Sequence, residues 1–417
     1  MLSISLLAFF STFILLRIYG NPFNVPLLCN LVFIINSIGV SYYSDLSLRS
    51  NVNDIYVASW FVYVCVIASL NSRALIIGCA NNTFSKCFDD IDSANKRRLK
   101  YVSIFFLFIG SIYFISGVPM FSEDPDRVRF EQQNIPLMGF VFRIIYWVLP
   151  FLSVLNFHFE RISVSNRSSR FSILFSVCVF VFCFLCGSKG AVIQFLLVHL
   201  MYLGYTGYNF LKLGRIILLC FFGVLTFYFV LLATQYYSGA EDLNKASEIL
   251  FVRLSQGSGE GYYKIVAEYT SVFGFGGGWY TFAKPLYTLG ATLKITSKSI
   301  LSVDSGTYIA AFFRGPYNLA PYTYTIFGQG YLDFGFSGSL LYAGSFGIFV
   351  NHINSSIQRE INSIMKCFKI AFGWSLISLA NWGYIDGWLA YSVLTLLFSL
   401  IVVVYFCKLS LKVEALR

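Results

Sequence analysis

Six basic residues lie in or near the connections between apolar stretches, or, for Arg143, about six residues inside an apolar stretch, where an arginine normally faces a polar cavity. Their chemistry suits phosphate binding. They are Arg127, Arg129, Arg143, Lys189, Arg253 and Arg314. A guanidinium grips phosphate oxygens through two parallel N–H donors, whereas an ammonium binds as a point charge. Several such charges on one surface would bind a lipid that carries a diphosphate.

Arg253 has the most informative surroundings. Ser238 and Glu241 have the spacing of a helix-capping box, and an apolar helix face follows that Gly257 is predicted to end. That face comprises Leu243, Ala246, Ile249, Leu250 and Leu254. Arg253 falls on it, where an unpaired charge is costly. It therefore either contacts an anionic ligand, or snorkels to the helix end and pairs with a loop carboxylate.

Two glycine runs follow Arg253. The alternate glycines of 257–261 permit a nest of backbone N–H groups that holds phosphate oxygens, although a flexible turn is favoured. No strand precedes this run, so it is not a dinucleotide-binding fingerprint. The second run, 276–278, precedes Trp279 and is expected to allow close packing.

Membrane-spanning helices must position these residues. The chain is 57% hydrophobic and 12% charged, whereas a soluble domain has about 25% charged residues. A span needs about 20 apolar residues. Eleven segments fit: 2–17, 22–43, 54–72, 101–116, 137–157, 171–187, 190–206, 215–233, 332–350, 369–385 and 386–406. We therefore predict an all-α, polytopic membrane protein in which residues 1–417 form a single integral membrane domain with eleven or twelve transmembrane helices.

The distribution of basic residues predicts the orientation of these spans. One alternating set of connections carries 18 of the 30 Lys and Arg residues and the other set carries 11. The first set is expected to be cytoplasmic. The N-terminus and the connections 117–136 and 234–331 then lie outside, and the C-terminus lies inside. The excess of positive charge thus reflects topology, and we expect no nucleic-acid partner.

The outer connection 234–331 has 98 residues, a length that is usually functional or disordered. Its many aromatic residues carry too much apolar area to stay solvated, so we expect it to fold on the membrane surface or to re-enter the bilayer. Rings such as Tyr263 and Tyr317 suit stacking on sugars, although aromatic residues also form a belt at membrane interfaces.

The outer connection 117–136 contains prolines and acidic residues that predict a turn. Arg127 and Arg129 point to the same side if the chain is extended there. The alternative is a solvated salt-bridge cluster with Glu123, Asp124 and Asp126.

Carboxylates are the candidate bases. The three histidines lie in or near cytoplasmic connections, and the outer loops hold no cysteine, so we expect no metal site and no cofactor. Proton transfer at the outer face then falls to carboxylates or tyrosine. The candidates are Glu260, Glu268, Asp304 and Asp333. We favour Glu260 or Asp333, the second of which lies at the outer mouth of span 332–350, where a rigid helix positions it.

This layout resembles that of the O-antigen polymerases, the Wzy-type oligosaccharide repeat-unit polymerases of the bacterial inner membrane. The resemblance covers nearly the whole chain. It rests on the many spans, the outer Gly-x-Pro-x-Phe segment from Gly117 with its arginines, the Gly187-Ser188-Lys189-Gly190-Ala191 hairpin, and an arginine before a glycine-rich stretch in the large late loop. Lys189 stands where the family more usually has arginine.

The resemblance implies a metal-independent glycosyltransferase of the GT-C type with its active site at the periplasmic face. Its substrates would be an undecaprenyl-diphosphate-linked oligosaccharide donor and acceptor, and its partners would include membrane lipid and a polysaccharide chain-length regulator. Arg253 and Arg314 would hold the donor diphosphate, with Arg127, Arg129, Arg143 and Lys189 as supporting charges.

Two other functions fit part of the pattern. An O-antigen ligase has a similar layout but carries a functional histidine in its large outer loop, where this chain has none. A lipid-linked oligosaccharide flippase would also be basic and polytopic, but internal symmetry and short connections are expected of it. The 98-residue connection favours the polymerase.

Overall fold

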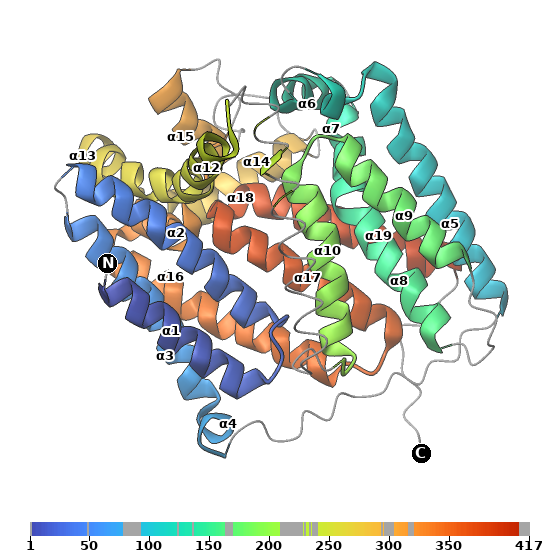
Figure 1. Ribbon diagram of the computed structural model, residues 1–417, viewed down its shortest axis with the longest axis horizontal. Coiled ribbons are helices and arrows are strands. Elements are labelled where there is room, and N and C mark those ends of the chain that lie inside the picture. The colour runs from blue at the N-terminus through green and yellow to red at the C-terminus, as the bar shows by residue number, and fades with distance from the viewer. Residues whose placement is uncertain are drawn as a thin grey trace. The chain divides into compact units, whose positions relative to one another are not determined.

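The computed structural model describes residues 2–47, 50–77, 93–122, 125–135, 137–162, 170–208, 241–292, 304–315 and 321–407, together with residues 228, 231, 232, 235 and 295. Throughout this part of the chain every regular element is a helix (Figure 1). The predicted all-α class is thereby confirmed for these residues. Helices suit a chain of long apolar segments, because they satisfy their backbone donors and acceptors internally.

The chain forms two compact units, each assembled from three stretches. Unit 1 comprises Met1–Asn82, Tyr208–His352 and Leu376–Ala390. Unit 2 comprises Thr83–Gly207, Ile353–Ser375 and Tyr391–Arg417. Both units contain long apolar helices.

Unit 1 combines N-terminal helices with the helices of the long late connection. The former are α1 (Leu2–Tyr19), α2 (Val25–Ser47), α3 (Ser50–Leu70) and α4 (Ser72–Ile77). The latter are α12 (Leu243–Lys264), η4 (Ile265–Tyr269), α13 (Thr270–Phe273), η5 (Trp279–Ala283), α14 (Lys284–Thr292) and α15 (Ser305–Arg314). The first part of α16 (Thr325–Arg359), the end of α17 (Ser363–Trp382) and α18 (Ile385–Gly387) complete it. Within this unit α12 packs along α2.

Unit 2 is built from the middle of the chain and its C-terminal helix. It contains α5 (Ser93–Ile112), η1 (Tyr113–Ser116), η2 (Pro119–Phe121), α6 (Pro125–Asn134), α7 (Met138–Arg143), η3 (Ile144–Val148), α8 (Leu149–Ile162), α9 (Arg170–Leu185) and α10 (Lys189–Tyr205). The end of α16, the start of α17, part of η7 (Trp388–Val393) and α19 (Leu394–Cys407) belong to it as well.

Among the described residues, six helices are long and apolar enough to cross a membrane. They cover Val25–Asp45, Asn51–Leu70, Ala94–Phe121, Met138–Glu160, Ser363–Trp382 and Ile385–Cys407. Three shorter apolar helices overlap the predicted spans 2–17, 171–187 and 190–206. The predicted span 332–350 lies within α16, and most of 215–233 lies outside the described residues. These helices suggest a multi-pass membrane protein, for which a total of eleven spans stays a prediction.

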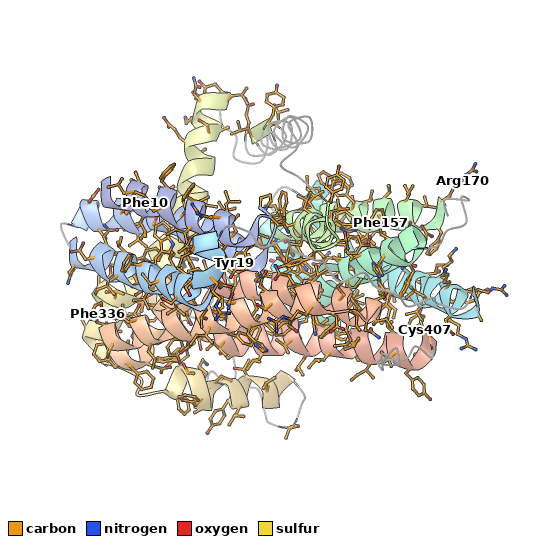
Figure 2. All side chains as sticks on the ribbon, turned by 90° about the horizontal axis from the view of Figure 1, so that it is seen from below. Phe10, Tyr19, Phe157, Arg170, Phe336 and Cys407 are labelled. Carbon is orange, nitrogen blue, oxygen red and sulfur yellow. The ribbon has the colours of Figure 1, made fainter. Side chains whose placement is uncertain are left out.

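Exposed aromatic side chains support this conclusion. Figure 2 labels Phe10 on α1 and Phe336 on α16, and both are exposed. Many other large apolar side chains on the described helices are exposed as well. Soluble monomers rarely expose contiguous apolar surface of large extent, whereas lipid covers it in a membrane protein.

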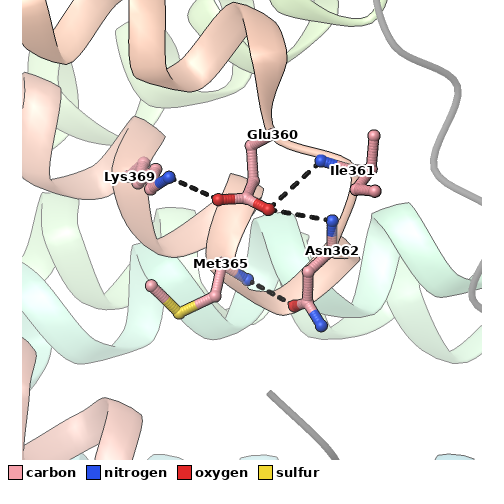
Figure 3. Close-up of polar contacts among 5 residues, drawn as sticks. All are labelled: Glu360, Ile361, Asn362, Met365 and Lys369. Carbon is pink, nitrogen blue, oxygen red and sulfur yellow. Dashed lines mark hydrogen bonds and ion pairs between the residues drawn. The ribbon is translucent and has the colours of Figure 1, made fainter. Parts of the chain in front are cut away.

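Glu360 stabilises the connection between α16 and α17 in unit 2. Its carboxylate accepts hydrogen bonds from the backbone N–H groups of Ile361 (3.1 Å) and Asn362 (3.0 Å) and pairs with Lys369 (Figure 3). The Asn362 side chain in turn accepts a hydrogen bond from Met365 N at 3.0 Å. Burial alone would raise the pKa of Glu360, but these donors outweigh it and lower that pKa. The connection is therefore a tight, charged turn.

Candidate functional site

α12 continues through the glycine run that the sequence predicts to end it. The helix extends from Leu243 to Lys264, so the predicted stop at Gly257 is wrong, as are the flexible turn and the N–H nest over 257–261. Its N-cap is Asp242, whose side chain accepts a hydrogen bond from Lys245 N at 2.7 Å. The cap predicted at Ser238 is therefore also wrong, and Ser238 itself lies outside the described residues.

The glycines of α12 are positions of close packing. A Cβ atom on Gly259 would lie 2.6 Å from the backbone of Gly39 on α2, and one on Gly261 would collide with the carbonyl oxygen of Thr323. Small residues let helix backbones approach each other in membrane proteins. This contact offsets the cost of about 1 kcal/mol that an interior glycine imposes on a helix. A pattern that is typical of a loop thus belongs to a helix interface.

Because the helix continues, Glu260 and Lys264 lie one turn apart on the same face. Lys264 Nζ is 3.3 Å from Glu260 Oε1. The Tyr322 hydroxyl donates a hydrogen bond to Glu260 Oε1 at 3.1 Å and accepts one from Lys264 Nζ at 3.3 Å. A carboxylate, an ammonium and a phenol therefore form a closed triangle in unit 1.

Arg314, the last residue of α15, extends this group. Its Cζ lies 3.9 Å from the centroid of the Tyr322 ring, a cation–π contact. Lys264 Nζ lies 5.0 Å from the Phe313 ring. Arg314 is exposed and has neither an ion pair nor a hydrogen bond to any described residue, so its N–H groups are available to an anionic ligand.

Two stacked tyrosines flank the carboxylate. Tyr43 on α2 hydrogen-bonds to the Glu260 side chain and stacks on Tyr263, with ring centroids 5.9 Å apart and an interplanar angle of 25°. We call Tyr43, Glu260, Lys264, Arg314 and Tyr322 the Glu260 cluster. It places a hydrogen-bonding carboxylate and two cations beside aromatic rings, the combination expected for a sugar that carries a phosphate.

The Glu260 cluster is partly shielded from solvent. The side chains of Glu260 and Lys264 are 20% and 26% exposed. Burial lowers the pKa of Lys264, but the hydrogen bond with Tyr322 and the charge of Glu260 outweigh burial, so that the pKa lies above its ordinary value. Lys264 therefore stays an ammonium at neutral pH and keeps a positive charge next to the carboxylate.

Two predicted residues of the long connection are only partly described or not described. The backbone of α12 places position 253 seven residues before Glu260, two turns away on the same helix face. The Arg253 side chain and all of Tyr317 lie outside the described residues. The choice for Arg253 between an anionic ligand and snorkelling therefore stays a prediction.

Asp333 binds a neighbouring helix start. It is 1% exposed, and its carboxylate accepts hydrogen bonds from Tyr280 N at 3.0 Å and from the Thr281 hydroxyl. The glycine run 276–278 also contacts Asp333, because Gly277 N donates a hydrogen bond to its backbone carbonyl oxygen at 2.9 Å. α16 is kinked immediately afterwards, at Phe334 and Gly335. Asp333 thus holds η5 against α16, and its use as a base stays a prediction.

In unit 2 the connection 117–136, predicted to be an outer one, contains α6. Residues Pro125–Asn134 form α6, so the extended chain that would point Arg127 and Arg129 to the same side is wrong. Proline is favoured in the first turn of a helix, where its missing N–H is not needed. Arg127 pairs with Glu131 at 2.8 Å in an exposed i,i+4 bridge. The predicted salt-bridge cluster stays a prediction, because Glu123, Asp124 and the Asp126 side chain lie outside the described residues.

Arg129 meets the Gly-Ser-Lys-Gly hairpin. Its Nη1 donates a hydrogen bond to the carbonyl oxygen of Gly187 at 3.1 Å. Ser188 caps α10, whose first residue is Lys189; the side chain of Lys189 is not described. Arg143 lies elsewhere in the unit, with Cζ 4.3 Å from the Tyr391 ring. Unit 2 therefore brings Arg129 and the hairpin together.

Sequence reasoning missed three members of the Glu260 cluster, namely Tyr43, Lys264 and Tyr322. The i,i+4 spacing of Glu260 and Lys264 would have indicated their pair if the helix had been continued through the glycines. No local signal connects Tyr43 or Tyr322 to Glu260, because their contacts are long-range.

Of the predicted site residues, Glu260 and Arg314 belong to the Glu260 cluster of unit 1, and Tyr263 lies beside it, stacked on Tyr43.

No protein-family model, no curated protein and no solved structure matches the chain.

Proposed function

We propose that this chain is a glycosyltransferase that polymerises undecaprenyl-diphosphate-linked oligosaccharide repeat units into O-antigen chains at the periplasmic face of the bacterial inner membrane. One observation carries the proposal. Glu260 Oε1 lies 3.3 Å from Lys264 Nζ and 3.1 Å from the Tyr322 hydroxyl, and the Arg314 guanidinium makes a cation–π contact with the Tyr322 ring. A general base and fixed cations are parts that metal-free glycosyl transfer from a diphosphate requires. The resemblance of the sequence layout to O-antigen polymerases supports the same function.

Glu260 is the general base in this mechanism. The acceptor hydroxyl attacks the anomeric carbon of the donor, and its proton passes to the Glu260 carboxylate as the new C–O bond forms. Tyr322 and Lys264 hold that carboxylate in place through their hydrogen bond and ion pair. A base within hydrogen-bond reach of the reacting hydroxyl typically contributes about 10²–10⁴-fold to the rate.

Arg314 acts on the leaving group. The bond between the anomeric carbon and the diphosphate oxygen breaks, and its electron pair leaves with the diphosphate. Fixed positive charge aimed at the site where negative charge develops stabilises the transition state. Arg314 supplies this charge through its available guanidinium donors, and Lys264 adds a second charge nearby.

Deletion of the gene in a bacterium that makes this surface polysaccharide tests the function. A polymerase defect leaves lipopolysaccharide cores with one repeat unit, whereas loss of a ligase or a flippase leaves cores with none. Gel analysis of the lipopolysaccharide distinguishes these outcomes, and a core without any repeat unit would overturn the proposal.

A second test uses purified protein in vesicles with a synthetic lipid-linked repeat unit. We expect lipid-linked products of two or more units, detected by mass spectrometry. A flippase would move the unit across the bilayer without lengthening it, so transport without elongation counts against the polymerase.

A further inference from the structure

A second group of charges in unit 1 lies at the start of α15, the ten-residue helix that ends at Arg314. Asp386 on α18 is fully buried, and its Oδ2 accepts hydrogen bonds from Ser305 N at 2.7 Å and from the Ser305 hydroxyl at 3.0 Å. Thr288 on α14 donates to the same oxygen at 3.3 Å. Asp386 therefore receives the first N–H of α15 and ties α15 to α14.

Asp304 and Lys284 complete this group. Asp304 caps α15, accepting hydrogen bonds from Thr307 N and the Thr307 hydroxyl, both at 2.9 Å. Lys284 is buried and lies within electrostatic reach of both carboxylates. We call Lys284, Thr288, Asp304, Ser305 and Asp386 the Lys284 cluster.

The first turn of α15 also holds the segment that carries Tyr322. Tyr322 N donates a hydrogen bond to the Gly306 carbonyl at 3.0 Å. A Cβ atom on Gly306 would lie 2.7 Å from both the Tyr322 carbonyl oxygen and the Tyr384 ring, so backbone and ring fit tightly there. Displacement of Ser305 would therefore move both partners of the Arg314–Tyr322 contact.

We propose that Asp386 is a positioning residue for the candidate site: it anchors Ser305, and through α15 it sets the place of Arg314 over Tyr322 beside Glu260. Asp386 touches none of these three side chains through a described hydrogen bond or ion pair. It acts along α15, from Ser305 at one end to Arg314 at the other. The role in catalysis rests on the proposed function, whereas the anchoring of α15 does not.

Hydrogen exchange tests the anchoring without any activity assay. In Asp386→Ala, amide exchange in residues 304–315 and at Tyr322 should accelerate by about tenfold to a hundredfold, as expected for lost charge-assisted hydrogen bonds. Exchange in unit 2 should not change, and Glu268→Ala, at an exposed carboxylate of the same unit, serves as the matched control. Unchanged exchange over 304–315 would overturn the proposal.

Two more conservative variants test the anchoring of α15 if Asp386→Ala does not fold. Asp386→Asn keeps an oxygen acceptor for Ser305 and should restore most of the protection of α15. Ser305→Ala removes only the hydroxyl donor and should accelerate exchange in 304–315 by about tenfold, the effect of one hydrogen bond to a charged group. Slow exchange in Ser305→Ala, equal to that of the wild type, contradicts the anchoring role.

A double-mutant cycle tests the route to the site. If Asp386 acts through Arg314, Asp386→Ala should lower kcat more than it alters KM, and should have little further effect in an Arg314→Ala background. Additive losses would overturn the positioning role even where exchange supports the anchoring. If the wild type forms no polymer, the proposed function fails while the exchange experiment still judges the anchoring.

Discussion

Unit 1 holds two groups of opposite charges that differ in their access to solvent. In the Glu260 cluster the Lys264 side chain is 26% exposed. Lys264 and Arg314 each make a cation–π contact with an aromatic ring. In the Lys284 cluster, Lys284 and Asp386 are 1% and 0% exposed, and backbone and hydroxyl donors surround the carboxylate. A charge removed from the first group leaves partners that water still solvates, whereas one removed from the second leaves buried charges without compensation.

The difference in exposure indicates that the Glu260 cluster serves activity and the Lys284 cluster serves stability. Burial lowers the pKa of Lys284, and the nearby Asp386 and Asp304 oppose that shift in part. Lys264 has its pKa raised instead. We therefore expect variants of the Glu260 cluster to change activity more than stability, and variants of the Lys284 cluster to change stability first.

Glu260→Gln should have the largest effect on activity. The amide keeps the shape of the side chain but cannot accept the acceptor's proton, so we expect polymerisation in vesicles to fall by about 10²–10⁴-fold. Thermal unfolding in detergent should stay close to that of the wild type. Glu248→Gln, at an exposed position twelve residues earlier on α12, is the matched control and should polymerise normally. Normal chain length from Glu260→Gln would remove Glu260 from the mechanism.

Lys284→Met should have the largest effect on stability. It leaves Asp304 and Asp386 without their buried counter-charge, so the free energy of unfolding should fall by about 3–5 kcal/mol. Equilibrium unfolding in detergent measures this loss. Lys245→Met, at an exposed lysine of α12, should change the same free energy by less than about 0.5 kcal/mol. A well-folded Lys284→Met variant would show that the two carboxylates do not depend on this lysine.

The comparison also shows what the sequence can predict. The length of the apolar segments alone predicts the helical class and most of the long apolar helices that the structure describes, because this length can be read without knowing which segments pack together. The course of α12 could not be predicted in this way. Gly259 is favourable in a helix only because Gly39 of α2, far away in the sequence, meets it there. The same glycine without that neighbour is typical of a turn.

The candidate site shows the same division. Glu260, Arg314 and Tyr263 could be chosen from residue type and from their place in the long connection 234–331. Tyr322 and Asp386 could not, because their importance lies in long-range bonds to Glu260 and Ser305. Prediction of Arg127 and Arg129 on one side was wrong since it assumed an extended chain, whereas Pro125 starts a helix.

Arg314→Lys should have an intermediate effect. The substitution keeps the charge but loses the planar guanidinium that lies on Tyr322 and offers parallel donors to a diphosphate. We expect kcat to fall by about tenfold, since an exposed cation–π contact contributes about 0.5–1 kcal/mol and the bidentate contact adds to it. Comparison of Tyr322→Leu with Tyr322→Phe isolates the cation–π contribution, because both variants lose the hydroxyl bonded to Glu260 and only Tyr322→Phe keeps the ring under Arg314. Full activity in Arg314→Lys would mean that a point charge suffices.

Lys264→Met should have a small effect on stability. The pair with Glu260 is partly solvated, so we expect a loss of at most about 1 kcal/mol, which shrinks as salt is added. The pKa of Lys264 is raised in the folded state, so the pair's contribution is full below the ordinary lysine pKa of about 10.4 and is lost as pH rises through the higher, folded value. Unfolding of wild type and variant should therefore converge in strong base. A loss of several kcal/mol at neutral pH, as expected for Lys284→Met, would show that the two clusters do not differ in the way that their exposure indicates.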